Sequence, residues 1–210
     1  MSLREPSAAL STFLVAAALA GCGGSSSKSA PAATKPLTQT AATTTQGAAA
    51  LQAEAASAAA GDIPDNQVFL DFNNRAAGYR VKYPEGWAQR GSGGSVTFRD
   101  KNNIVRIVVA KGSAPTAATV RRELARLRGA RVTTPPTTMA ISGSSAIHAV
   151  YETRSAPNSV TGKTVTLGVD RYYLWKGGSV AIVDLGSPVA PVKVDNVDAY
   201  RLIIQSFRWR

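Results

Sequence analysis

The sequence has 210 residues and a formal net charge of +11, from 24 Lys and Arg against 13 Asp and Glu. It contains one cysteine and one histidine, which excludes an intrachain disulfide and a metal site built from several cysteines or histidines. Aromatic and large aliphatic residues are concentrated in residues 62–210, a length typical of one domain with one hydrophobic core.

The N-terminus has the pattern of a lipoprotein signal peptide. Residues 8–20 are apolar apart from one serine and one threonine, and this stretch is too short to span a bilayer as a helix. The tetrapeptide Leu19-Ala20-Gly21-Cys22 matches the bacterial lipobox, in which the cysteine thiol receives a diacylglyceryl group before cleavage. We therefore expect residues 1–21 to be a lipoprotein signal peptide. An ordinary signal peptide with an incidental cysteine is the alternative.

Lipid on Cys22 predicts where the mature chain lies. Diacylglycerol, with an N-acyl chain such as palmitate in some cells, would anchor the protein at the extracytoplasmic face of the cell membrane, and no other cofactor is expected. Residues 22–61 are then the lipidated cysteine and a disordered tether, because they are rich in Ala, Ser and Thr and contain no aromatic residue. Residues 48–60 favour a helix through their alanines, but they offer no apolar face for docking.

Strands in succession are predicted within the domain of residues 62–210. Tyr79, Val81 and Tyr83 alternate with charged residues, which is typical of a half-buried strand. Residues 100–103 and 176–179 are predicted hairpin turns. The predicted strands cover residues 67–72, 78–83, 95–99, 104–110, 131–134, 138–141, 145–153, 163–176 and 180–185.

Two helices are predicted among these strands. Residues 116–128 place Val120, Leu124 and Leu127 on one stripe, and Gly129 follows as a C-cap. A last helix is expected to begin after Asp195 as its N-cap and to carry apolar residues at helical spacing up to Phe207. The expected fold class is α+β, an antiparallel β-sheet with helices packed against it.

Four segments of the domain resemble the PsbP/Mog1 superfamily, in the order that the family has them. They are Gly78–Trp87 with its proline-glycine-tryptophan turn, Val96–Asp100, the pair Tyr172–Trp175 and Val180–Val183 around a glycine turn, and Ile203–Phe207. The resemblance implies an α-β-α sandwich around an antiparallel sheet and a non-enzymatic binding or assembly role. It does not carry over photosystem or Ran binding, because the Ala/Thr-rich tether replaces the N-terminal segment of PsbP and a secreted lipoprotein does not meet Ran.

Large aromatic side chains are expected to anchor the core, since each buries a large apolar area. The residues chosen for this role are Trp87, Phe98, Tyr173 and Phe207.

Catalytic residues are not evident. His148 lies in a predicted strand, and no Gly-x-Ser-x-Gly motif supplies a nucleophile for it. The glycine-rich residues 91–94 precede a strand rather than a helix, which favours a hairpin turn over a phosphate-binding loop. We therefore interpret His148 as structural or surface, and we expect neither an enzyme nor a metal site.

Five arginines lie within eleven residues of the sequence, in and after the first predicted helix. They are Arg121, Arg122, Arg126, Arg128 and Arg131. One interpretation is a solvated helix face. The other is a patch that binds anionic lipid headgroups or an acidic cell-wall polymer, with each basic residue contributing about 1 kcal/mol near a charged membrane. Nucleic acid is not an expected partner, because the chain is exported and no aromatic residues interleave the arginines.

Two functions from different classes remain open. The first is a membrane-anchored, non-enzymatic accessory module that binds an envelope partner. The second is a carrier or sensor for a small amphiphile held between sheet and helix. An accessory module predicts a filled core and an exposed patch, whereas a carrier predicts a pocket with aromatic and aliphatic walls.

Overall fold

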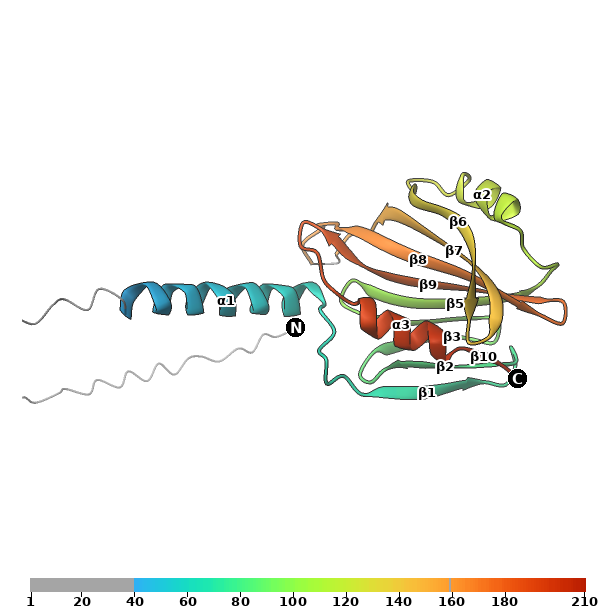
Figure 1. Cartoon of the computed structure of the whole chain (residues 1–210), viewed down its shortest axis with the longest axis horizontal. Coiled ribbons are helices and arrows are strands. Elements are labelled where there is room, and N and C mark those ends of the chain that lie inside the picture. The colour runs from blue at the N-terminus through green and yellow to red at the C-terminus, as the bar shows by residue number, and fades with distance from the viewer. Residues whose placement is uncertain (1–39, 159) are drawn as a thin grey trace, which may run out of the picture. The chain divides into compact units, whose positions relative to one another are not determined.

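Two antiparallel sheets frame the domain in the computed structural model, which describes residues 40–158 and 160–210 (Figure 1). The larger sheet has seven strands in the order β3-β4-β5-β9-β8-β7-β6, and the smaller has three in the order β1-β2-β10. Consecutive hairpins build most of the larger sheet, as the sequence predicts. The signal peptide, Cys22 and the first part of the tether lie outside the described residues.

The described elements follow one another along the chain as three helices and ten strands. Their bounds are α1 Thr40–Ala60, β1 Phe69–Asn74, β2 Tyr79–Pro84, β3 Ala88–Ser92, β4 Ser95–Asp100, β5 Asn103–Lys111, α2 Ala117–Leu124, β6 Arg131–Ile141, β7 Ser144–Arg154, β8 Thr166–Lys176, β9 Ser179–Ala190, α3 Val197–Ser206 and β10 Arg208–Trp209.

One face of the seven-stranded sheet packs against α3 and the small sheet. Its interior is apolar, and Phe98, Ile107 and Ile203 are fully buried there. Burying a side chain of this kind stabilises the fold by about 1.5–3 kcal/mol relative to leaving it in water. Aromatic contacts strengthen this layer, because the ring of Phe98 stacks on Tyr83 with centroids 4.2 Å apart.

The opposite face of the large sheet carries α2. Val120 and Leu124 are buried there against a second apolar cluster from β7 and β8 that includes Tyr173. Helices therefore cover both faces of an antiparallel sheet, and the predicted α+β class with its α-β-α arrangement is confirmed. The four aromatic anchors expected from the sequence, Trp87, Phe98, Tyr173 and Phe207, are all buried.

Helix α1 occupies part of the segment that the sequence predicts to be a disordered tether, including residues 48–60, whose alanines favour a helix. Residues 47–56 are exposed throughout, so the alanine-rich sequence holds its helix through intrinsic propensity rather than through packing. The end of α1 is attached to the domain, because Lys101 Nζ donates to the carbonyl of Ala58 at 2.5 Å. Neither α1 nor another described helix is both long and apolar enough to cross a membrane.

Two buried asparagines fix the start of the domain. The backbone N–H of Ile63 donates to Asn196 Oδ1 at 2.9 Å, and the amides of Asn103 and Asn196 both donate to the carbonyl of Gly61. This use of Asn196 corrects the prediction for the last helix. Its N-cap is Asn196 rather than Asp195, and the Asn196 side chain serves the distant backbone of Ile63 instead of the helix.

Helix α2 and strands β6 and β3 also differ from prediction. Helix α2 ends at Leu124 rather than residue 128, because the chain continues in tight turns in which Leu127 N–H donates to Leu124 O. The two short strands predicted on either side of Pro135 and Pro136 are one irregular edge strand, β6. Strand β3 was not predicted, because all five of its residues are exposed and they carry no apolar alternation.

Candidate functional site

Helix α2 is short, and its N-terminus is capped by side chains. Thr116 and Thr119 form a capping box, in which Thr119 N–H donates to Thr116 Oγ1 at 3.1 Å and Thr116 N–H donates to Thr119 Oγ1 at 2.9 Å. Val120 and Leu124 attach the helix to the sheet. Gly129, with φ +71°, then lets the chain turn toward β6. Residues close in sequence therefore determine where α2 begins and where the chain turns after it.

The predicted arginines divide into two groups. Arg121 and Arg122 lie in α2, Arg126 and Arg128 lie in the turns that follow, and all four are exposed. Within the described residues none of these four forms an ion pair. Arg131, in β6, instead pairs with Glu152 of β7 at 2.6 Å. Four of the five arginines are therefore exposed and outside any ion pair among the described residues. We call these four, Arg121, Arg122, Arg126 and Arg128, the basic platform.

The one acidic side chain of α2 is turned toward the sheet. Glu123 Oε1 accepts a hydrogen bond from Tyr173 OH at 2.9 Å and one from Arg171 Nη1 at 3.2 Å. Residues 117–130 contain no other Asp or Glu. Glu123, the one carboxylate within residues 117–130, is therefore already bonded to the sheet.

A buried ion pair lies beneath this helix. The guanidinium of Arg171 holds Asp184 with two hydrogen bonds, Nε to Oδ1 at 2.6 Å and Nη2 to Oδ2 at 2.9 Å. Both residues are 5% exposed, and Arg171 Nη2 also donates to Tyr151 OH at 3.3 Å. Burial lowers the pKa of Arg171, but the hydrogen bonds and charge of Asp184 raise it more, so the guanidinium stays charged.

This ion pair was missed from the sequence, although the sequence carries a signal for it. Residues 177 and 178 form the turn of the β8–β9 hairpin, and both glycines have positive φ as that turn requires. Counting outward from the turn pairs Arg171 directly with Asp184, as the structure has them. When a hairpin turn is clear from the sequence, oppositely charged residues that lie the same number of positions before and after it are therefore predicted to pair across the two strands.

His148 is half-buried and structural in its contacts. Its Nε2 lies 2.7 Å from Asp170 Oδ1, and its ring stacks on Tyr172 with centroids 4.5 Å apart. Among the described residues, no three His, Cys, Asp or Glu side chains are grouped so that they could hold a metal ion. His148 thus contacts Asp170 and Tyr172 within the sheet, and its interpretation as structural or surface stays a prediction.

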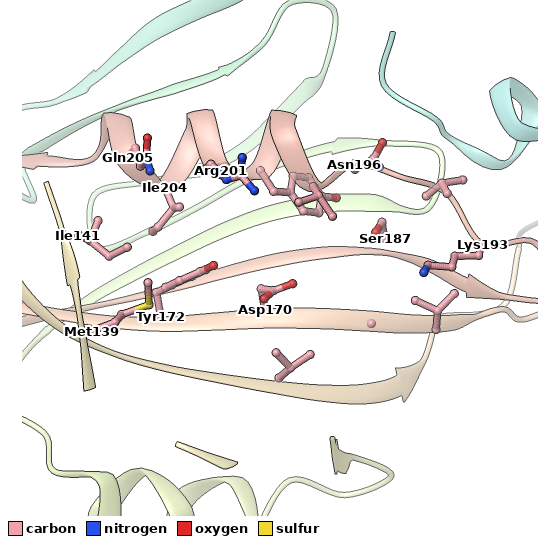
Figure 2. Close-up of a pocket in the computed structure, with 16 residues that line it drawn as sticks. Met139, Ile141, Asp170, Tyr172, Ser187, Lys193, Asn196, Arg201, Ile204 and Gln205 are labelled. Atoms are coloured by element: carbon pink, nitrogen blue, oxygen red, sulfur yellow. The ribbon is translucent and has the colours of Figure 1, made fainter. Parts of the chain in front are cut away.

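A groove lies between α3 and strands β6–β9, on the face of the large sheet away from α2 (Figure 2). Its volume is about 440 Å³, and its walls are mainly apolar, including Met139, Ile141 and Ile204. Asp170, Lys193 and Arg201 are the charged residues among its lining. The carrier alternative predicts a pocket between sheet and helix, but no sequence pattern identified the residues that line it.

Known proteins resemble this chain in fold but not in sequence. No protein-family model and no curated protein matches the sequence. The structure is similar to cyanobacterial PsbP of Synechocystis sp. PCC 6803, with 16% identity, a TM-score of 0.48, and coverage of 71% of this chain and 98% of that one. It is similar to the Ran-binding protein Mog1p of Saccharomyces cerevisiae, with 9% identity, a TM-score of 0.45, and coverage of 69% and 96%.

A protein of Bacteroides thetaiotaomicron is also similar, with 16% identity, a TM-score of 0.45 and coverage of 67% of this chain and 48% of that one. This chain therefore spans about half the length of the Bacteroides protein. PsbP and Mog1, to which the sequence motifs point, are both among the solved structures that resemble this chain.

Proposed function

We propose that the chain is a non-enzymatic binding module, anchored by lipid on Cys22 at the extracytoplasmic face of the cell membrane, and that it docks on an anionic envelope surface through the basic platform. The observation that carries this proposal is the arrangement of charges around α2. Four arginines are exposed, while Glu123 and Glu152 are each occupied by another partner.

Phosphate-bearing lipid headgroups fit this platform by charge. An Arg or Lys close to an anionic membrane contributes about 1 kcal/mol, so four arginines acting together supply a few kcal/mol. The guanidinium group also binds phosphate oxygens through two parallel hydrogen bonds, which an ammonium cannot do. Because these interactions are between exposed charges, raising the salt concentration weakens them.

The lipid anchor makes such weak docking effective. A chain anchored at Cys22 stays close to the membrane surface, so its basic platform meets the headgroups at a high effective concentration. A tethered domain therefore needs little intrinsic affinity to remain docked. An envelope protein with an acidic surface is an alternative partner for the same platform.

Vesicle binding tests the docking step without the anchor. The full chain carrying Cys22→Ser would be titrated with phosphatidylglycerol vesicles and with phosphatidylcholine vesicles, with bound protein measured by sedimentation. We expect binding to the anionic vesicles alone, and loss of most of it in a variant with Arg121, Arg122, Arg126 and Arg128 changed to Ser. The charge-matched control changes four exposed cations outside α2 to Ser, namely Arg75, Arg90, Lys163 and Lys176. Equal loss in both variants would show that net charge alone matters and would reject the platform.

A separate experiment tests the anchor. In the bacterial host, the full chain should incorporate radiolabelled palmitate and fractionate with membranes, and Cys22→Ser should abolish both. A labelled Cys22→Ser chain, or an unlabelled wild type, would reject lipid attachment at Cys22 while leaving the vesicle result unaffected.

A further inference from the structure

The groove between α3 and the large sheet is separate from the basic platform, which lies on the opposite face of the sheet. Figure 2 shows Arg201 and Ile204 extending from α3 and Asp170 and Tyr172 from the strand opposite, toward a shared space. A volume of about 440 Å³ lies within the range of small-molecule sites, which is roughly 300–1,000 Å³.

A glycine shapes one end of this groove. Gly168 lines the groove on β8, and a Cβ at this position would lie 2.8 Å from Val189 Cγ1. Any larger residue there would force Val189 to move. Glycine on β8 thus lets the Val189 side chain pack directly against the strand at this end of the groove.

Apolar side chains form most of the wall and continue onto its rim. Ile141 and Ile204 are buried, whereas Met139 is 38% exposed and Val197 is 60% exposed. Exposed apolar side chains that continue from an apolar groove favour an interaction site. An apolar chain lying in the groove would cover them.

The charged residues that line the groove indicate the chemistry of the ligand's polar head group. Arg201 and Lys193 supply two cations, and both are exposed to the solvent at the groove. Arg201 also pairs with Asp198 at 3.0 Å, but that pair is on the surface and contributes little. The one carboxylate of the lining, Asp170, has Oδ1 engaged by His148, and its second oxygen remains free to accept a hydrogen bond from a ligand hydroxyl.

We propose that the groove binds a single-chain amphiphile whose head carries an anionic phosphate and a hydroxyl group. The apolar chain lies between α3 and the sheet, the phosphate is bound by Lys193 and Arg201, and the hydroxyl donates to Asp170. Charge complementarity and the apolar rim together fit this ligand better than a neutral sugar or an acidic peptide.

Binding would be measured by calorimetry with myristoyl lysophosphatidylglycerol below its micelle concentration, using the full chain with Cys22→Ser. Changing both Lys193 and Arg201 to Gln should weaken binding about tenfold or more, since hydrogen bonds to charged groups contribute this much. The control changes Arg75 and Lys163 to Gln, which are exposed outside the groove and should leave affinity unchanged. Equal affinity of the wild type and the groove variant would overturn the proposal.

Two tryptophan substitutions test the position of the apolar chain. Val150→Trp fills the half-buried wall, and Met139→Trp narrows the mouth at an exposed residue, where a larger side chain disturbs packing less. Both should reduce affinity at least fivefold, whereas Val68→Trp, at an exposed valine outside the groove lining, should not. Unchanged affinity in Met139→Trp would overturn the proposed position. A two-chain complex in native mass spectrometry that Met139→Trp abolishes would instead assign the groove to a second copy, and would overturn the proposal.

Discussion

The two faces of the large sheet are covered in different ways. On one face, α3 and the small sheet bury an apolar layer in which Phe98 and Ile203 have no contact with solvent. On the other face, the short helix α2 is held by a few apolar contacts and by Glu123, which bonds to Arg171 and Tyr173. We therefore expect most of the stability to come from the first face. On the second face, the bonds of Glu123 to Arg171 and Tyr173 position α2, and its arginines are exposed to solvent.

The largest effect is expected from the apolar face. Phe98→Ala should lower the free energy of unfolding by about 4 kcal/mol, because it removes a fully buried ring and leaves a cavity. Urea unfolding followed by tryptophan fluorescence would measure this. A loss of less than 1 kcal/mol would mean that this layer can collapse around the gap and is not the main source of stability.

The buried ion pair tests the other face. Asp184→Ala should cost about 3 kcal/mol, because it leaves the guanidinium of Arg171 buried without its main partner. The double variant Arg171→Met with Asp184→Leu should regain most of this loss, since an apolar pair of similar volume avoids the buried charge. The control Asp198→Ala removes an exposed partner of Arg201 and should change stability by less than about 1 kcal/mol. A double variant less stable than Asp184→Ala would contradict this account of the pair.

The capping box gives a smaller effect confined to α2. Thr116→Ala should cost about 1 kcal/mol by removing the acceptor for Thr119 N–H. Hydrogen exchange should become faster in residues 117–124, with α3 unchanged. Faster exchange throughout the domain would show that the two faces unfold together.

A last effect is confined to alkaline pH. Burial raises the pKa of Tyr172 to about 12, and the charge of Asp170 adds to this rise. The unfolded chain loses this proton near pH 10, so stability contributed by neutral Tyr172 is complete below pH 10 and is lost as the pH rises toward 12. Urea unfolding at pH 8 and pH 11 should show a smaller decline for Tyr172→Phe than for the wild type. Equal declines would contradict this role of Tyr172.

Local patterns predicted the hairpins, the anchors of the core and the exposed arginines, because each depends on residues close together in the chain. Turn glycines and alternating Tyr79, Val81 and Tyr83 are signals of this kind. The Asn103–Asn196 contact joins segments far apart in sequence, and nothing local indicates it. The carrier alternative predicted a pocket between sheet and helix, but its lining residues could not be predicted, because they come from α3 and four strands that are far apart in sequence.

Hydrogen exchange of the full Cys22→Ser chain with and without phosphatidylglycerol vesicles tests the central claim most directly. The claim is that α2 and the turns after it, residues 117–130, form the docking surface. We expect vesicles to slow exchange in these residues, and we expect this protection to disappear when the four arginines of the basic platform are changed to Ser. Protection confined to α3, or protection of residues 117–130 that persists without the arginines, would contradict the account.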